Sequence, residues 1–225
     1  MISFFKILIE NLPSWGPEML WAAGETLKLT SISFLLAVFI GSFLAIIRTS
    51  GNVFFRSIAL AFIEIGRGTP ALVILFMIYF GLPAISPNLQ FSSFVAAVIG
   101  LGLQGGAILA ETFRAGIEAI DIGQREASLS LGLMPFHAMV DVIAPQAFRI
   151  VLPPTGNYVI GLLKDTAIAS IIAAPELMLR AKDLASSSFM PMHLYVLAGL
   201  IYFAMSYPLS LLVGRMEMAL SKGRT

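Results

Sequence analysis

The chain has 225 residues, of which 58% are hydrophobic and 12% are charged, with a formal net charge of +1 and no cysteine. A typical soluble domain has about 45–50% apolar and about 25% charged residues, so this composition predicts a membrane protein. The lack of cysteine excludes disulfides, thiolate metal sites and cysteine nucleophiles, and the small net charge gives no basis for nucleic-acid binding.

The first apolar stretch, residues 2–9, is too short to cross a bilayer, which takes about 20 apolar residues. It contains Lys6, is followed by Glu10 and Pro13, and lacks a small-residue cleavage pattern. These features favour an interfacial amphipathic helix over a signal peptide. We therefore predict an N-terminal segment, residues 1–20, at the membrane interface or on its periplasmic side.

Five later windows are nearly free of charge and, with their apolar flanks, are long enough to cross a membrane. They are Leu29–Ile47, Ala71–Leu82, Phe91–Leu109, Ile150–Leu163 and Leu194–Val213. Turns are predicted at Thr49–Asn52, at Gly81–Pro83 with Ser86–Asn88, and at Ser186–Ser188 with Pro191. The predicted fold is an all-α membrane protein with five transmembrane helices in one domain, residues 21–218, and a tail at 219–225.

Lysine and arginine are unevenly distributed among the segments between these windows. One set of segments holds Arg48, Arg56, Arg114, Arg125, Arg149, Arg215, Lys222 and Arg224. The other set holds Lys6, Arg180 and Lys182, and its loop from Gly81 to Gln90 has no charge. Because basic residues concentrate in cytoplasmic loops, the first set is predicted to be cytosolic, with the N-terminus outside and the C-terminus inside.

Several ionisable residues fall at membrane depth, where an unpaired charge is costly and usually functional. Glu64 and Arg67 lie in the second span beside the helix-breaking run Gly66–Pro70, and Lys164 and Asp165 end the fourth. Irregular backbone at that depth is tolerated only against protein or a wet cavity. The two features predict a polar translocation path lined by spans two and four.

An amine-bearing solute suits these groups. Glu64 and Asp165 can meet an ammonium or a cationic side chain, and Arg67 or backbone N–H groups near Gly68 can meet a carboxylate. The alternative is that Glu64 and Arg67, three residues apart on a helix, neutralise each other and that Lys164 reaches the interface. Both interpretations remain open.

Span three contributes two further features. Gln104 lies among four glycines, Gly100, Gly102, Gly105 and Gly106, which predict close helix packing, and it is included in the predicted path. Glu111 and Arg114, one turn apart at the cytosolic end, are predicted to form an ion pair.

The segment 112–147 is long for a loop and carries its own helical pattern, which is typical of a functional segment. Asp121 with Gln124–Glu126 predicts a helix start, Gly132 a tight turn, and Pro135 a second short helix to about Asp141, with Pro145 closing the segment. From pattern alone, a solvated loop with incidental helicity remains an open alternative.

Within this segment the chain reads Glu126-Ala127-Ser128, then Gly132, then Val142-Ile143-Ala144-Pro145. This spacing resembles the signature of the membrane permease subunits of ATP-binding-cassette (ABC) importers for polar amino acids: Glu-Ala-Ala, three residues, Gly, nine residues, Ile-x-Leu-Pro. Ser128, Val142 and Ala144 depart from that pattern but preserve the helix–glycine–helix geometry.

The resemblance extends over residues 20–218. The runs GETLKLT (24–30), EIGRGTP (64–70), AETFRAG (110–116) and KDT (164–166) are similar to this subfamily and occur in its order. Ile108 stands where the family often has Tyr, and Ala167 where Ser is common. Both departures can alter substrate contacts, so Ile108 joins the predicted path.

The resemblance implies a type I ABC importer permease fold in a bacterial inner membrane, carrying a polar amino acid or a related amine-bearing, in particular cationic, solute by alternating access. It implies that a cytosolic ABC ATPase subunit docks on Glu126, Ala127, Ser128, Gly132 and Pro145. A second permease chain, identical or homologous, and a solute-binding protein on the outer side are the other implied partners. The chain has no GxxxxGK[ST] run, so we expect it to bind no cofactor and to have no catalytic residue, with ATP and Mg²⁺ used by the ATPase.

Two other function classes fit less well. An ion-coupled secondary transporter would use Glu64, Lys164 and Asp165 as ion sites, but it predicts inverted repeats, which the sequence lacks, and leaves the segment 112–147 unexplained. An intramembrane enzyme needs a nucleophile and a base, yet the chain has no cysteine, no GxSxG, and only His137 and His193 near loops. Neither histidine has metal-ligand spacing, so no metal site is predicted.

Overall fold

The computed structural model describes residues 2–49 and 52–221, and in these residues it contains helices and turns but no strand. The longer helices are α1 (Ile2–Thr49), α2 (Val53–Gly68), α5 (Ser93–Glu118), α8 (Ala144–Asp165), α9 (Leu177–Ser188) and α10 (Pro191–Ser221). The shorter elements are α3 (Ala71–Phe76), the π-helical turn η1 (Met77–Gly81), α4 (Leu82–Ile85), the 3₁₀ turn η2 (Pro87–Leu89), α6 (Ile122–Ser130), α7 (Pro135–His137), the π-helical turn η3 (Ala138–Ile143) and the 3₁₀ turn η4 (Thr166–Ile172). Ser50, Gly51, Lys222 and Arg224, which carried parts of the turn and charge predictions, lie outside the described residues.

Three helices, α1, α5 and α10, are each long and apolar enough to cross a membrane. Two further candidates are bent pairs: α2 with Ala71–Ile85, bent by 109°, and Pro135–Ile172 with α9, bent by 50°. Counting each bent pair as one span gives the predicted five, and the all-helical fold class is confirmed. A proline stands in each break, Pro70 and Pro175, where its missing N–H interrupts the helical hydrogen bonds.

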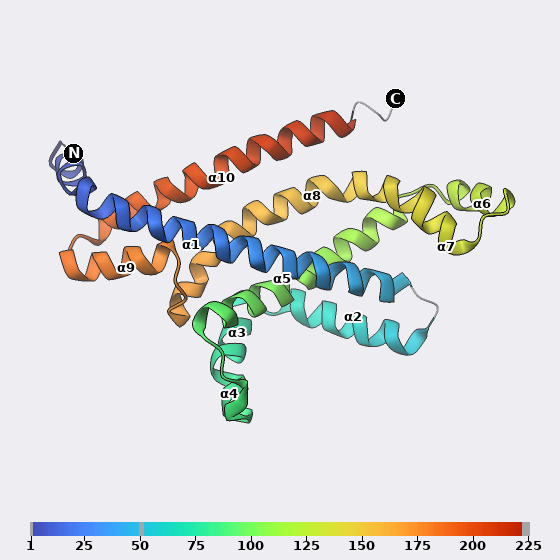
Figure 1. Cartoon of the computed structure of the whole chain (residues 1–225), viewed down its shortest axis with the longest axis horizontal. Helices are drawn as coiled ribbons and strands as arrows, with labels where there is room; N and C mark the ends of the chain where they lie inside the picture. Colours follow the sequence, from blue (N-terminus) through green and yellow to red (C-terminus); the bar gives the residue numbers. More distant parts are fainter. Residues whose placement is uncertain (1, 50–51, 222–225) are drawn as a thin grey trace.

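Figure 1 shows α1 and α5 side by side along the middle of the molecule, with α8 and α10 above them and α3 and α4 projecting as an arm. At one end of the long axis α1 ends, α2 begins, α5 ends and α8 begins, together with α6 and α7. We call it the arginine end, because these elements carry Arg48, Arg56, Arg114, Arg125 and Arg149. The opposite end, formed by α9 and the starts of α1 and α10, is the α9 end.

Close packing of α1 on α5 depends on glycine. A Cβ added at Gly102 would lie 2.6 Å from the Leu36 side chain, and one at Gly106 would lie 2.5 Å from that of Ile40. From the other helix, a Cβ at Gly41 would lie 2.9 Å from the Leu109 side chain. The predicted packing role of the span-three glycines is therefore confirmed.

The N-terminal stretch is helical, but it is not the separate short helix that the sequence predicts. Helix α1 runs from Ile2 through Pro13 and Pro17 into the first span without a break. Trp15 and Met19 are buried in a cluster with Leu177 of α9 and Leu194 of α10. This packing stabilises the helix across two prolines that local propensity alone would disfavour. The interfacial position of residues 1–20 stays a prediction.

Two of the predicted turns are helical instead. Gly81–Pro83 lies within η1 and α4, and the chain changes direction only at Ser86, whose φ is −150° and ψ 125°. Ser186–Ser188 form the last turn of α9, and the reversal follows at Phe189, whose φ is 56°. The three serine hydroxyls donate to carbonyls of their own helix, which explains why a serine run is compatible with helix there.

Candidate transport and coupling sites

The bend in the second span is built around Thr69 and Pro70. Pro70 disfavours helical backbone at the preceding residue, and Thr69 is extended, with φ −97° and ψ 131°. The Thr69 N–H donates to the Ile65 carbonyl at 3.0 Å, and the Gln104 side-chain amide donates to the Thr69 carbonyl at 3.0 Å. The break predicted at Gly66–Pro70 is therefore present, and α5 supplies a partner for the carbonyl at the bend.

This bonding already uses one of the backbone donors expected near Gly68. The sequence analysis offered backbone N–H groups near Gly68 as partners for a substrate carboxylate, but the adjacent Thr69 N–H is engaged by the end of α2. Gly66 has a different role, because a Cβ there would lie 2.7 Å from the Ala107 side chain. It allows α2 to approach α5 closely.

The charged groups before the bend form the pair that the i,i+3 spacing predicts. Glu64 Oε1 and Arg67 Nη1 are 3.9 Å apart, and their side chains are 63% and 46% exposed. Arg67 also lies close enough to Glu111 of α5 for electrostatic interaction. Gln104 and Ile108 follow each other by one turn on α5, and Ile108 is 36% exposed. Gln104 thus lies at the α2–α5 contact through its bond to Thr69, whereas Glu64 and Arg67 have exposed side chains on the adjoining turn of α2.

Asp165 stands apart from this group. It is the last residue of α8, is followed directly by η4, and is exposed, as is Lys164. Neither side chain makes a hydrogen bond or an ion pair within residues 2–49 and 52–221. Tyr158, earlier on α8, lies against Gly105 of α5 and within electrostatic range of Asp165. Among the described contacts, Asp165 therefore has no direct bond to Glu64 or Arg67.

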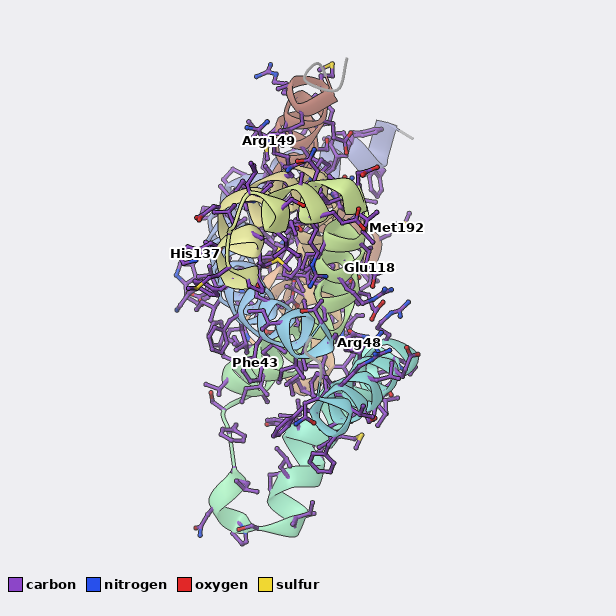
Figure 2. All side chains as sticks on the ribbon, turned by 90° about the vertical axis from the view of Figure 1, so that its right-hand side faces the viewer. Phe43, Arg48, Glu118, His137, Arg149 and Met192 are labelled. Carbon is purple, nitrogen blue, oxygen red and sulfur yellow. The ribbon has the colours of Figure 1, made fainter. Side chains whose placement is uncertain are left out.

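An ionic cluster joins α1 to the arginine end of α5. Arg114 Nη2 lies 2.7 Å and its Nε 2.9 Å from Glu111 Oε2, and Arg114 also contacts Glu118. The predicted Glu111–Arg114 pair is confirmed. Arg48 of α1 adds a contact of 3.6 Å to Glu111 Oε1, which the sequence analysis missed because no local spacing relates the two residues. Figure 2 shows Arg48 and Glu118 at this end of the molecule.

The turn after α6 is a Schellman motif, in which a left-handed residue ends a helix. Gly132 has φ 84°, its N–H donates to the Leu129 carbonyl at 3.0 Å, and the Leu133 N–H donates to the Ser128 carbonyl at 3.2 Å. Nothing lies within 4 Å of a Cβ added at Gly132. Glycine is therefore favoured by backbone conformation and not by crowding. The predicted tight turn is confirmed.

Ser128 and Gln146 secure α6 against the rest of the chain. Ser128 is buried, and its hydroxyl donates to the Gln124 carbonyl at 2.6 Å, so the polar atom that replaces the family's alanine is satisfied. The Gln146 amide donates to the Val142 carbonyl at 2.9 Å and to Gln124 Oε1 at 3.4 Å. Glu126 and Ala127 lie on the exposed side of α6.

The second helix of the segment does not close at Pro145, contrary to the sequence prediction. It continues from α7 through η3 into α8, with Pro145 in the first turn of α8. A π-helical turn bonds each N–H one residue farther back, and this locally wider turn precedes the proline that lacks an N–H. The segment is therefore rigidly continuous with the fourth span.

The tip of the segment, formed by the α6–α7 turn, exposes large apolar side chains. Leu131, Met134 and Phe136 are 83%, 70% and 70% exposed. Contiguous apolar side chains of this kind on a polar segment mark an interaction site.

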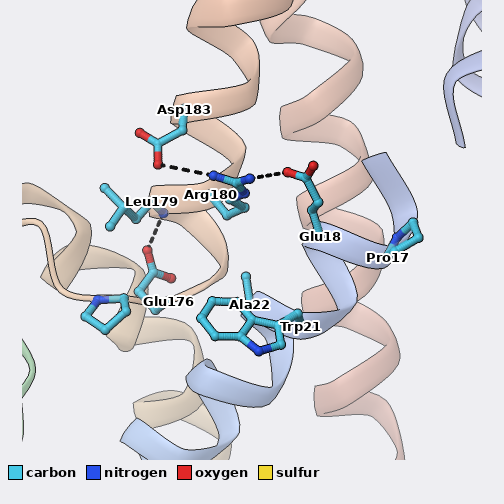
Figure 3. Close-up of a pocket in the computed structure, with 9 residues that line it drawn as sticks. Pro17, Glu18, Trp21, Ala22, Glu176, Leu179, Arg180 and Asp183 are labelled. Atoms are coloured by element: carbon cyan, nitrogen blue, oxygen red, sulfur yellow. Dashed lines mark hydrogen bonds and ion pairs between the residues drawn. The ribbon is translucent and has the colours of Figure 1, made fainter. Parts of the chain in front are cut away.

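At the α9 end, a cleft of about 490 Å³ lies between α1 and α9. Figure 3 shows Arg180 between Glu18 of α1 and Asp183, with Glu176 below. The buried Glu176 carboxylate accepts from the Met178 N–H and from the Tyr202 hydroxyl at 2.6 Å. The sequence analysis missed this cluster, because it assigned no helix between the fourth and fifth windows and only a turn to Ser186–Ser188.

Residues 37–223 match the family described as binding-protein-dependent transport system inner membrane component. The chain belongs to this family. The matched range contains the bend, the ionic cluster and the segment 112–147 with its glycine turn. The family and fold expected from the signature spacing are confirmed.

Curated relatives cover most of the permease. The probable amino-acid ABC transporter permease protein YckA of Bacillus subtilis (strain 168) is 38% identical over 199 residues, which are 88% of this chain and 85% of YckA. The arginine transport system permease protein ArgU of Corynebacterium glutamicum is 39% identical, over 91% of this chain and 68% of its own length.

A solved structure, described as an amino acid ABC transporter with histidines, matches with a TM-score of 0.87 and 35% identity. The match covers 93% of this permease and 97% of the solved chain. A chain of the MetNI methionine ABC transporter matches with a TM-score of 0.74 at 18% identity, which supports the fold alone. The permease therefore has the type I ABC importer fold.

Proposed function

We propose that this permease is the membrane subunit of an ATP-driven importer for a polar, in particular cationic, amino acid or a related amine-bearing solute. The observation that carries the proposal is the coupling segment, residues 112–147. It presents an exposed apolar tip on a glycine-specific turn and is continuous with the fourth span. A segment of that construction can pass the movement of a docked partner directly to a span.

The arginine end faces the cytosol in this proposal, with the N-terminus outside and the C-terminus inside. Arg48, Arg56, Arg114, Arg125 and Arg149 all belong to elements at that end, whereas Lys6, Arg180 and Lys182 belong to elements at the α9 end. The positive-inside rule supports this orientation. This orientation places the apolar tip of the coupling segment in the aqueous cytosol, where exposure of its apolar side chains to water is unfavourable.

The tip is the docking site of a cytosolic ABC ATPase subunit, which supplies ATP and Mg²⁺ chemistry. Leu131, Met134 and Phe136 provide the apolar anchors, and the exposed Glu126 and Ala127 flank them on α6. Ser128, Gly132 and Pro145 act within the segment: the first anchors α6, the second turns the chain, and the third lies where the segment becomes α8. Closure of the ATPases then moves α8 and switches access between the two sides.

A second permease chain, identical or homologous, covers the arm of α3, η1 and α4. Met77, Phe80 and Ile85 on this arm are 63%, 59% and 80% exposed. Figure 1 shows the arm projecting away from the long helices, while Leu75 of α3 packs on α5 at its base. Five spans are too few to enclose a solute path, so a paired chain would complete it. Because the sequence has no cysteine, single cysteines on the arm are clean probes of this pairing.

Substrate passes the bend between α2 and α5. Glu64 and Asp165 suit an ammonium or a cationic side chain, Arg67 suits a carboxylate, and Gln104 with Ile108 shapes the adjoining wall. The descriptions of ArgU with arginine and of the solved relative with histidines support a cationic amino acid. A solute-binding protein would deliver it at the α9 end, where the charged cleft of Glu18, Arg180 and Asp183 opens.

Co-purification tests the central step. The affinity-tagged permease, expressed from its native operon, is expected to co-purify with an ATPase subunit that hydrolyses ATP. After the ATPase subunit is removed, the permease alone should not hydrolyse ATP. Leu131→Glu should release the ATPase, because a charge replaces an apolar anchor. Met192→Glu is the matched control, a charge at a 65% exposed apolar position of the α9 end. Equal ATPase recovery with both variants would contradict docking at the tip.

A further inference from the structure

A cleft of about 550 Å³ lies at the arginine end, between the end of α1, the first turn of α2 and the coupling segment. Four arginines from four helices line it: Arg48 of α1, Arg56 of α2, Arg114 of α5 and Arg125 of α6. Glu118 and Asp121 are its acidic lining residues. Four guanidinium groups from separate elements therefore converge on this cleft, against two carboxylates in its lining.

The acidic groups near the cleft are already engaged. Glu111 pairs with Arg48 and Arg114, Glu118 pairs with Arg114, and the Asp121 carboxylate accepts from the Gly123 N–H at 2.7 Å at the start of α6. Arg56 and Arg125 have no ion-pair partner within residues 2–49 and 52–221. Two guanidinium groups of the cleft lining, one from α2 and one from α6, are therefore uncompensated. This arrangement favours an anion with several acceptor oxygens.

An apolar groove of about 430 Å³ adjoins the basic cleft on its membrane side. It lies between α1, α5 and α8, with Val38, Phe113, Phe148 and Leu152 among its lining residues. Ile117 lines both hollows, so the groove and the cleft meet at this residue. A ligand that fills both has a charged head and a hydrocarbon chain.

The first turn of α2 shows the same two-part chemistry. Phe54 and Phe55 are 69% and 56% exposed and immediately precede Arg56. Exposed apolar side chains directly beside a basic residue are typical of a helix turn at a membrane interface. This pattern suits a cleft at headgroup depth, where a freely diffusing phosphate compound would leave the groove empty.

We propose that the cleft binds the phosphate of an anionic phospholipid from the cytosolic leaflet, with Arg56 and Arg125 as its principal ligands and an acyl chain in the groove past Ile117. The location in that leaflet rests on the orientation proposed above. Basic hollows between helices at the cytoplasmic surface suit such headgroups. The bound lipid ties the start of α2 to α6, and so joins the second span to the coupling segment.

Lipid retention tests this proposal without any transport measurement, so it can fail independently of the proposed function. The permease, with the subunits that accompany it, is equilibrated in nanodiscs with graded phosphatidylglycerol in phosphatidylcholine, and bound lipid is counted by native mass spectrometry after release. Arg56→Gln should weaken phosphatidylglycerol retention about five-fold, the size expected for one arginine at a membrane surface. Arg215→Gln, an arginine of α10 outside the cleft, is the matched control.

The result that overturns the proposal is equal retention by Arg56→Gln and Arg215→Gln. If Arg56→Gln does not fold, Arg125→Gln replaces it on another helix with the same expectation. Excess glycerol 3-phosphate distinguishes the source of the phosphate: it should leave the lipid bound, and displacement of the lipid by it would assign the cleft to a soluble anion. Ile117→Trp, which fills the junction of groove and cleft, should reduce lipid retention as well.

Discussion

The Gln104 side-chain amide donates a hydrogen bond to the Thr69 main-chain carbonyl, 3.0 Å away, across the contact between α5 and the bend of the second span. In a continuous helix the Val73 N–H would donate to the Thr69 carbonyl. At the bend, the N–H groups of Val73 and Ile74 both donate to the Pro70 carbonyl, so the Thr69 carbonyl has no helical donor. One side chain of α5 thus stabilises the irregular backbone beside Glu64 and Arg67.

Replacement of Gln104 by Leu is expected to destabilise the permease by about 1–3 kcal/mol, because it leaves the Thr69 carbonyl without its donor at a half-buried position. Thermal unfolding in detergent, followed by the two tryptophans, measures the change. Ile108→Leu, one turn along α5, changes no polar group and should unfold near the wild-type temperature. A Gln104→Leu protein as stable as Ile108→Leu would mean that the hydrogen bond contributes little.

Glu111 is expected to matter more than its neighbour Glu118. Glu111→Gln leaves Arg48 and Arg114 facing each other without their shared carboxylate, whose side chain is only 18% exposed. A loss of about 1–3 kcal/mol follows for a charged hydrogen-bonded group. Glu118 is 60% exposed, so Glu118→Gln should cost less than about 1 kcal/mol. Thermal unfolding in detergent, repeated at high salt, compares the stability of the two variants. A larger loss for Glu118→Gln than for Glu111→Gln would contradict a stabilising role for the Arg48–Glu111–Arg114 contacts.

Gly132 provides a test of backbone conformation alone. Its φ is 84° and a Cβ has open space, so Gly132→Ala should cost about 1–2 kcal/mol in the turn without any clash. Gly132→Asn should cost less, because asparagine tolerates left-handed backbone.

The consequence for coupling can be measured as transport per ATP hydrolysed in proteoliposomes. The expected order is wild type, Gly132→Asn, Gly132→Ala, with normal membrane insertion throughout. Gly199→Ala is the matched control, a helical glycine of α10 whose added Cβ also meets nothing within 4 Å. Full coupling in Gly132→Ala would show that the turn can be rebuilt without glycine.

Features that depend on neighbouring residues were predictable from the sequence. The spans follow from runs of apolar residues, the break from Gly66–Pro70, the turn from Gly132, and the Glu111–Arg114 pair from helical spacing. In each case the deciding physics acts over one or two helical turns. Their prediction did not need the tertiary structure.

Features created by packing were not predictable. The Arg48–Glu111 and Gln104–Thr69 contacts join residues far apart in the chain, and no local pattern relates them. Helix α9 was missed because its serines and charges resemble a loop, although Leu177 and Ala181 are buried against α1 and α10. The helix through Pro145 was not predictable, because the π-helical turn before this proline has no sequence signature.

Asp165 gives the sharpest test of what the permease carries. Its exposed carboxylate has no ion-pair partner within the described residues, and a substrate ammonium would provide one. Asp165→Asn keeps the size of the side chain and removes the charge.

If the carboxylate contacts substrate, the substrate concentration for half-maximal transport should rise about ten-fold in this variant, which corresponds to the loss of one charge-assisted contact of about 1.4 kcal/mol. Uptake of radiolabelled arginine and histidine into proteoliposomes with saturating binding protein measures this. Glu10→Gln, an exposed carboxylate of α1 paired with Lys6, is the control and should leave the curve unchanged. An unchanged curve for Asp165→Asn would remove Asp165 from the path and leave Glu64 and Arg67 at the bend as the groups that meet the solute.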